Sequence, residues 1–123
     1  MGRNTRQRRA IADVFSRIDR PLRPEEVLES ARESVPSMGI ATVYRNLARL
    51  LQSGEIVGVN LPDVGTLYER AGKAHHHHFY CRQCGRLFDF PGCPVSDDHL
   101  VPPGFLVDGH ELFLYGTCED CRK

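Results

Sequence analysis

Residues 40–70 read IATVYRNLARLLQSGEIVGVNLPDVGTLYER, and this stretch decides the fold. Its apolar residues first recur every three or four positions, which is the spacing of one helical face. Gly54 is well placed to end that helix. Glu55–Asn60 and Thr66–Arg70 then read as two strands, joined by a turn at Pro62–Gly65. The stretch therefore predicts a helix followed by a β-hairpin.

Two further helices are predicted upstream of this stretch. Apolar residues within 11–18 follow the helical spacing, and Thr5 is a candidate N-terminal cap for that helix. Pro24 suits the first turn of a second helix, where Glu25 and Glu26 would meet the positive end of the helix dipole. Three short helices followed by a hairpin is the order of a winged helix. We favour this fold over a three-helix bundle with an incidental hairpin.

Charge separates the two halves of the chain. The 123 residues carry no net charge, but residues 1–60 hold ten Arg and seven acidic residues (+3). Residues 61–123 hold six basic and nine acidic residues (−3), together with all six His and all five Cys. The first part is therefore expected to meet a polyanion, and the second part to hold cations.

The sequence also bears on the cellular compartment. No apolar run approaches the roughly 20 residues of a membrane span. The basic N-terminus lacks the apolar segment of a signal peptide. We therefore expect a cytoplasmic protein without a membrane partner, in which cysteines bind metal rather than form disulfides.

A hinge and a second domain are expected after the hairpin. Residues 71–74 (AGKA) have a hinge-like composition, and the helical period disappears beyond them. We predict an α+β protein with a winged-helix DNA-binding domain at 1–70 and a small α/β metal-binding domain at 75–123. Within the second domain, Phe105–Tyr115 is rich in apolar and aromatic residues and reads as one or two strands.

Two CxxC pairs predict a structural zinc site. Their four residues are Cys81, Cys84, Cys118 and Cys121. Each pair can form a tight turn that presents two thiolates, and four thiolates make a closed tetrahedral zinc site. The alternatives are two redox dithiols or two disulfides. Gly85 after the first pair favours zinc, and no βαβ context supports a redox motif. Cys93 lies outside the two pairs, and three interpretations are open for it: a buried side chain that only fills space, a redox-sensitive thiol, or a haem contact through Cys93-Pro94. We favour the buried, space-filling side chain.

The run His75–His78 indicates further metal sites. Alternate residues of a strand point to opposite faces, so His76 and His78 share one face while His75 and His77 share the other. Glu69, Asp89 and His110 are candidate additional ligands. Imidazoles and carboxylates suit Fe²⁺, Mn²⁺, Zn²⁺ or Ni²⁺. The alternative is an adventitious nickel-binding tract like an expression tag.

Candidate DNA contacts lie on the third helix and at the N-terminus. A recognition helix reads base edges with its N-terminal residues, and arginines near the N-terminus can contact phosphates or enter a minor groove. Tyr44 also falls on the apolar stripe, so a core position is its alternative. The candidate residues are Arg3, Arg6, Arg8, Thr42, Tyr44 and Arg45.

With these residues assembled, the chain resembles the ferric uptake regulator (Fur) family of metal-responsive repressors. The resemblance rests on three segments, Gly39–Leu47, His75–Gly85 and His110–Gly116 with the final CxxC, and spans nearly the whole chain. It implies a homodimer that joins through the C-terminal domain. It also implies binding to an inverted-repeat DNA operator when a regulatory metal is present.

The resemblance further implies how the ligands are divided. The four cysteines of the CxxC pairs would hold the structural zinc, and the regulatory site would be Glu69, His76, His78 and Asp89. A second, less uniform site would be formed by His75, His77 and His110, with Asp97 or Asp98 as its carboxylate.

One position departs from the family's pattern. A histidine ligand that relatives commonly supply near the start of the second helix corresponds to Pro21 here, so the regulatory site would lose its direct tie to the helices. A zinc sensor more often has a cysteine where Glu69 stands, which favours Fe²⁺ or Mn²⁺ as the regulatory metal, with Zn²⁺ possible.

Several other functions compete with this one. Within the family these are a zinc, peroxide or haem sensor. Outside the family, a metal hydrolase is the first alternative. The sequence lacks the HExxH pairing of metal ligands and base that such an enzyme uses, so we expect no enzyme. The second alternative is a metal-binding protein that is stabilised by zinc and has no DNA function. Such a protein would not need the N-terminal arginines, which argues against it.

Overall fold

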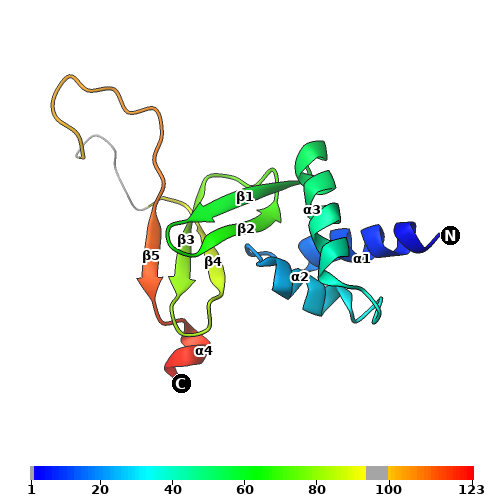
Figure 1. Cartoon of the computed structure of the whole chain (residues 1–123). Coiled ribbons are helices and arrows are strands. Elements are labelled where there is room, and N and C mark those ends of the chain that lie inside the picture. The colour runs from blue at the N-terminus through cyan, green and yellow to red at the C-terminus, as the bar shows by residue number, and fades with distance from the viewer. Residues whose placement is uncertain (1, 94–99) are drawn as a thin grey trace. The chain divides into compact units, whose positions relative to one another are not determined.

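The computed structural model describes residues 2–93 and 100–123, and the chain forms two compact units, Met1–Gly72 and Lys73–Lys123 (Figure 1). Within these described residues, the first unit contains three helices and a two-stranded sheet, and the second a three-stranded sheet and a short helix. This confirms the predicted α+β class. Every helix among the described residues is too short or too polar to cross a lipid bilayer.

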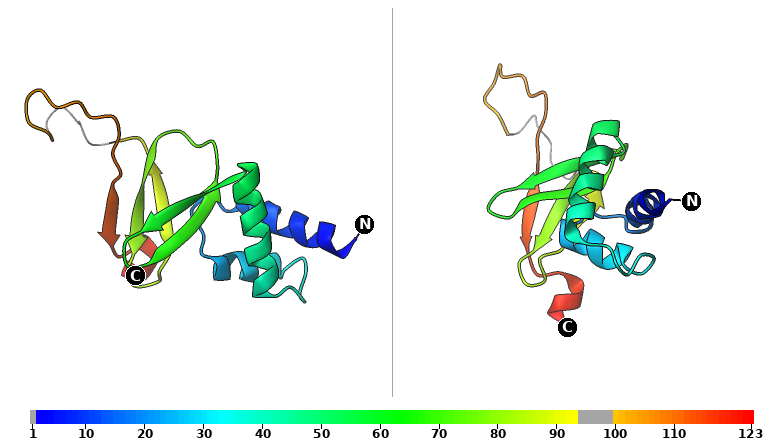
Figure 2. Two further views of the ribbon diagram at one scale, coloured as in Figure 1. Left: turned by 45° about the horizontal axis from the view of Figure 1, so that its top comes forward. Right: turned by 45° about the vertical axis from the view of Figure 1, so that its right-hand side comes forward.

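Three helices of the first unit enclose its apolar core. They are α1 (Arg3–Arg17), α2 (Pro24–Ala31) and α3 (Ile40–Ser53), and the right panel of Figure 2 looks nearly along α1. The buried core residues come from the three helices, from the segments that follow α1 and α2 (Leu22, Val35 and Met38) and from the first strand. They are Ala10, Ile11, Val14, Phe15, Leu22, Val27, Ala31, Val35, Met38, Val43, Leu47 and Ile56.

Helix α1 begins earlier than the predicted Thr5 cap. Gly2 is the N-cap in extended conformation, and its carbonyl accepts a hydrogen bond from Arg6 N at 3.1 Å. Arginine is a good helix former, so the basic residues at the start of the chain continue the helix. The basic N-terminal segment from Arg3 onward is therefore helical rather than an extended arm.

The hairpin predicted after α3 is present and is bonded to the helical part. Helix α3 ends at Gly54, whose φ of 80° lies in the left-handed region that glycine favours. Strands β1 (Ile56–Leu61) and β2 (Gly65–Arg70) pair antiparallel. Leu22 N donates to Tyr68 O at 2.7 Å and Tyr68 N to Leu22 O at 2.9 Å. These two bonds fix β2 to the segment between α1 and α2.

The second unit is a mixed sheet. Strand β3 (His76–Cys81) lies between β4 (Leu87–Pro91), which is antiparallel to it, and β5 (Phe113–Gly116), which is parallel; α4 (Glu119–Arg122) follows. The strand expected over Phe105–Tyr115 is much shorter. Pairing begins at His78 opposite Phe113, only two residues after β3 itself begins. Little of β3 is left for the preceding residues to pair with.

The second unit has a small apolar core. Among its described residues, the buried hydrophobic side chains are Leu87 and two cysteines, Cys81 and Cys118. A unit of about 50 residues with so few buried apolar groups needs a metal, a disulfide or a partner chain to be stable.

Candidate metal centres and nucleic-acid interface

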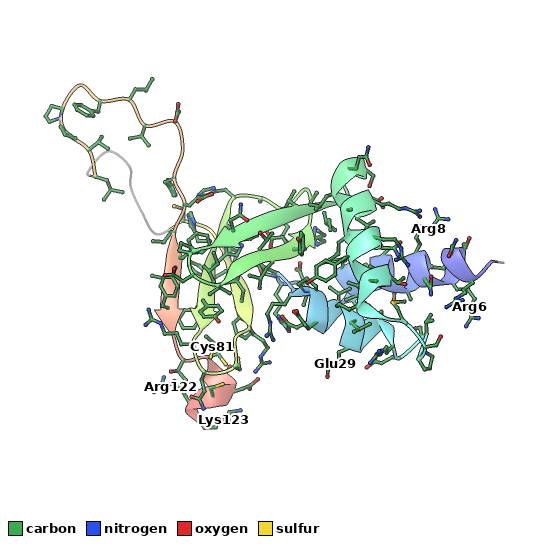
Figure 3. All side chains as sticks on the ribbon, viewed as in Figure 1. Arg6, Arg8, Glu29, Cys81, Arg122 and Lys123 are labelled. Atoms are coloured by element: carbon green, nitrogen blue, oxygen red, sulfur yellow. The ribbon has the colours of Figure 1, made fainter. Side chains whose placement is uncertain are left out.

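The four cysteines of the CxxC pairs come together in the second unit, in what we call the four-cysteine cluster. Cys81 ends β3, Cys118 caps α4 and Cys121 lies within it, and all four sulfurs lie within 4.8 Å of one another. Figure 3 shows Cys81 beside α4. The turn after Cys81 is closed by a hydrogen bond from Gly85 N to Cys81 O at 2.9 Å, with Gly85 at φ 74°.

The spacing of these sulfurs fits a zinc ion. Zn–S bonds of about 2.3 Å in a tetrahedron place sulfurs about 3.8 Å apart, and Cys84 Sγ and Cys118 Sγ are 3.8 Å apart. A disulfide requires about 2.05 Å, and none of the five cysteines, all of them among the described residues, forms one. The cluster therefore suits a closed zinc site with four thiolate ligands and leaves no position for a substrate.

Protein hydrogen bonds support thiolates in this cluster. The backbone N–H of Cys84 donates to Cys81 Sγ at 3.4 Å, and that of Cys118 at 3.3 Å. The Cys84 amide, chiefly, lowers the pKa of Cys81 to about 6 against the opposing effect of burial. A hydrogen bond with the Cys118 side chain raises the pKa of Cys121 to about 12. Zinc binding must therefore displace protons from the cluster.

Arg86 is a neighbour of the cluster that the sequence did not single out. Its Nε donates to Cys84 Sγ at 3.2 Å, and its Nη2 lies 3.5 Å from Asp120 Oδ2. Burial is the largest effect and opposes ionisation of Cys84, but hydrogen bonds from the Arg86 side chain, the Arg86 backbone and the Cys118 side chain together outweigh it, so the pKa of the Cys84 thiol is lowered. Arg86 thus partly compensates the negative charge that four thiolates and a divalent ion would leave.

A second donor group lies on one face of the β3–β4 hairpin. His78 pairs directly opposite Asp89, and the His76 and His78 rings are 4.9 Å apart between centroids. His76 Nε2 lies 3.9 Å from Asp89 Oδ2. His76 Nδ1 donates to Ala74 O at 2.8 Å, which leaves Nε2 as the atom available to a metal. This face offers two imidazoles and a carboxylate, a set that suits a divalent metal such as Fe²⁺, Mn²⁺ or Zn²⁺.

Lys73 also contacts this face of the hairpin, a contact that the sequence did not predict. Its Nζ lies 2.7 Å from Asp89 Oδ2. A lysine ammonium on a carboxylate competes with any cation for the same oxygen. A metal that takes Asp89 as a ligand must therefore displace Lys73 from that oxygen.

A third donor group lies on the opposite face of β3. It consists of His75, His77, Cys93 and His110, which we call the histidine–cysteine cluster, and its four donor atoms lie within 4.8 Å of one another. Burial, and then the neighbouring imidazoles of His75 and His110, lower the pKa of His77 and keep it neutral. The alternation of the histidines between the two faces is as the sequence predicts.

Cys93 differs from its predicted role. The favoured interpretation was a buried filler, yet Cys93 is exposed and its Sγ contacts two histidines of the cluster. The sequence expectation of Asp97 or Asp98 as the fourth donor falls on residues outside those the structure describes.

Of the predicted DNA contacts on α3, Tyr44 and Arg45 are exposed and Thr42 is half-buried. Tyr44 is 51% exposed, so it does not belong to the core. The core-facing side of α3 is instead occupied by Val43 and Leu47, which are buried. Arg45 is exposed and its Nη2 donates to Thr42 Oγ1 at 3.0 Å.

The predicted arginines of α1 are also exposed. Arg3, Arg6 and Arg8 are exposed residues of this helix, and Figure 3 shows Arg6 and Arg8 projecting outward from it. Arg8 also lines a groove between α1 and α3, together with Arg9 and Arg49. The first unit thus presents positive charge on two helices.

Two positions of the first unit concern the regulatory site expected from the family resemblance. Glu69 lies in β2. Pro21, at the position where the resemblance implies a histidine ligand in relatives, has no ligand atom in its side chain. The adjacent Leu22, however, is hydrogen-bonded to Tyr68, next to Glu69. The backbone therefore ties Glu69 to the helices without a metal ligand at position 21.

Comparison with known proteins gives consistent matches. The model of the ferric uptake regulator family matches residues 2–115. The ferric uptake regulation protein of Campylobacter jejuni is 31% identical over 124 residues, covering 97% of this chain and 79% of the relative. The zinc uptake regulation protein of Mycobacterium tuberculosis is 31% identical, covering 98% and 95%.

A solved structure of similar fold is that of the Helicobacter pylori ferric uptake regulator, which reveals three functional metal-binding sites in that protein. It aligns with a TM-score of 0.73 and 27% identity, covering 95% of this chain and 80% of the other.

Proposed function

Because this chain belongs to the ferric uptake regulator family of metal-sensing transcription regulators, we propose that it is a cytoplasmic repressor that binds an inverted-repeat operator as a homodimer when a regulatory metal is bound. Members of the family are regulators rather than enzymes. The observation that carries the proposal is the group His76, His78 and Asp89, which offers a divalent metal three ligands on one face of the hairpin.

The parts of the chain divide this work. Residues 1–70 bind double-stranded DNA, 71–74 act as a hinge, and 75–123 join the two protomers and hold the metals. Exposed Tyr44 and Arg45 contact bases, with Thr42 beside them, and the α1 arginines Arg3, Arg6 and Arg8 contact phosphates. The four-cysteine cluster, formed by Cys81, Cys84, Cys118 and Cys121, holds structural Zn²⁺.

Metal binding is coupled to DNA binding through the hinge. Glu69, by family resemblance, supplies a carboxylate from β2 to a metal held by His76, His78 and Asp89. That ligand set would fix the separation of the two recognition helices, which an operator requires to be about 34–36 Å, one helical turn. A coupling of about 1–3 kcal/mol corresponds to roughly 5- to 150-fold tighter DNA binding.

Fe²⁺ or Mn²⁺ is the favoured regulatory metal. The ligands are imidazole and carboxylate, and Glu69 stands where a zinc sensor of the family more often has cysteine. A zinc sensor is the second candidate, because Zn²⁺ also accepts these ligands and the M. tuberculosis relative, a zinc uptake regulator, is 31% identical to the chain.

Selection from a random duplex library tests the proposed function. Zinc-loaded protein is used with and without Mn²⁺, an air-stable substitute for Fe²⁺. Enrichment of an inverted repeat only with Mn²⁺ is expected. Enrichment regardless of metal would show that sensing is uncoupled from binding. A repeat enriched only with excess Zn²⁺ would identify the zinc sensor, and no enrichment in any arm would contradict DNA binding altogether.

Replacing either His78 or Glu69 with alanine is expected to abolish the metal dependence of DNA binding. Each variant removes one ligand, so the roughly 5- to 150-fold tightening by Mn²⁺ should fall to none, while the structural zinc remains bound. Fluorescence anisotropy on the selected operator measures the effect. Asp108→Ala, which removes an exposed carboxylate, serves as control. Unchanged metal dependence in both ligand variants would show that the regulatory metal binds elsewhere.

Replacing Lys73 with methionine is expected to tighten metal binding at the same site. The variant removes the ammonium that lies 2.7 Å from Asp89, so a metal no longer has to displace it. Both side chains of the pair are nearly buried, at 8% and 13% exposure. The gain should therefore be at least that of an exposed ion pair, about 0.2–1 kcal/mol, or about 1.4- to 5-fold in affinity. Competition against a fluorescent chelator measures this. Lys123→Met should leave the affinity unchanged, and weaker binding by the Lys73 variant would show that Lys73 assists the metal.

A further inference from the structure

The donor atoms of the histidine–cysteine cluster converge on one point. Cys93 Sγ lies 3.2 Å from His77 Nε2 and 3.1 Å from His110 Nε2. His110 Nε2 lies 3.1 Å from His77 Nε2 and 3.3 Å from His75 Nε2. The four residues come from four places: just before β3, within β3, after β4 and before β5. Such convergence requires the whole sheet to be assembled.

These distances match a tetrahedral metal site. With metal–nitrogen bonds of about 2.0–2.1 Å and a metal–sulfur bond of about 2.3 Å, tetrahedral geometry places nitrogens about 3.3 Å apart and nitrogen and sulfur about 3.6 Å apart. The observed nitrogen–nitrogen separations of 3.3 and 3.1 Å agree with this geometry. The nitrogen–sulfur separations of 3.2 and 3.1 Å are about 0.4–0.5 Å shorter than a bound metal would require. A small adjustment of the donors around a common centre is all that separates the cluster from a ligand shell.

Hydrogen bonding alone accounts poorly for this arrangement. A neutral imidazole Nε2 either donates one proton or accepts with one lone pair. His110 Nε2 nevertheless has three polar atoms within 3.3 Å: His75 Nε2, Cys93 Sγ and His77 Nε2. At most one of these contacts can be a good hydrogen bond at a time. A cation at the centre satisfies all four atoms together.

We propose that Cys93 is the fourth ligand of a second zinc site, with His75, His77 and His110 as the other three. A thiolate beside three imidazoles favours Zn²⁺ over Mn²⁺ and Fe²⁺ because sulfur is a soft ligand. The carboxylate expected at this site, Asp97 or Asp98, is then not required. The two faces of β3 consequently select different metals, a thiolate site on one and a carboxylate site on the other.

Co²⁺ provides the test, because it takes the same ligands as Zn²⁺ and is coloured. Protein whose four-cysteine cluster already holds zinc is titrated with Co²⁺. Tetrahedral visible bands and a near-ultraviolet thiolate-to-cobalt charge-transfer band are expected, with zinc content unchanged. Cys93→Ser should remove the charge-transfer band and lower Zn²⁺ affinity at this site by at least about 10-fold. Circular dichroism checks that this variant, altered at an exposed position, stays folded.

Two control variants separate this site from others. The double variant Asp97→Asn/Asp98→Asn and the single variant His78→Ala should both retain the full charge-transfer band. A band that persists in Cys93→Ser would place cobalt at the cysteines of the CxxC pairs and overturn the proposal. Loss of cobalt binding in the aspartate variant but not in Cys93→Ser would assign the fourth ligand to a carboxylate. These readouts involve no DNA, so the proposal stands or fails separately from the repressor function.

Discussion

Replacing Cys81 with serine is expected to unfold residues 73–123 while residues 2–72 remain folded. Cys81 is fully buried and receives two backbone N–H groups on its sulfur. Structural zinc contributes an apparent binding energy of about 10–16 kcal/mol in zinc-finger peptides. The second unit buries few apolar side chains that could replace this contribution.

Hydrogen exchange followed residue by residue measures the effect of the Cys81 variant. Protection should disappear from β3, β4 and β5 and remain in α1 and α3, and elemental analysis should show loss of the zinc held by the four-cysteine cluster. Asp108→Ala is the control, because it changes an exposed residue of the same unit that belongs to none of the proposed metal sites. Retained protection in β3 without zinc would show that apolar packing alone suffices.

Replacing Leu47 with alanine is expected to have the reciprocal effect on the first unit. Leu47 is 2% exposed and lies in the core on the inner side of α3. Truncating a buried leucine costs about 2–5 kcal/mol. A folded unit of this size is stable by roughly 4–11 kcal/mol, so the change removes a large share of the stability. DNA binding should weaken although Tyr44 and Arg45 are intact.

Urea unfolding of the first unit, followed by amide exchange in α3, measures this loss. Leu51→Ala is the control, because Leu51 belongs to the same helix but is 40% exposed and should change stability by about 0.5 kcal/mol or less. The zinc content of the second unit should be unaffected in both variants. A Leu47 variant as stable as the Leu51 variant would contradict the assignment of Leu47 to the core.

Local sequence signals predicted most elements of the first unit. The apolar spacing of α3, Gly54 as its end and the hairpin after it all depend on residues close in the chain. Thr5 was wrong as a cap because the extended Gly2 serves instead and the following arginines continue the helix. The extent of β5 was overestimated for a different reason. Apolar content at 105–112 indicates a strand, but a strand also needs a partner, and β3 provides one only from His78 onward.

The same holds for the metal sites: features that depend on residues close in the chain were predicted, and features that depend on distant residues were not. Alternation within His75–His78 predicted which histidines share a face, because it follows from strand geometry alone. Cys93 was misinterpreted because its position depends on the turn after β4, where Gly92 has φ 79°. Its contact with His110 further depends on the alignment of β5 with β3. Lys73, likewise, gave no signal in the sequence beyond its place in the hinge.

The parallel pairing of β5 with β3 leads us to expect an order of folding within the second unit. β3 and β4 are joined by residues 82–86, whereas β3 and β5 are separated by residues 82–112. Closing the roughly sixfold longer loop costs about 1.6 kcal/mol more in chain entropy. We therefore expect the hairpin to form first and to present Cys81 and Cys84 as half of a zinc site. Capture of Cys118 and Cys121 by that zinc then recruits β5, so the folding rate of this unit should rise with the concentration of free zinc.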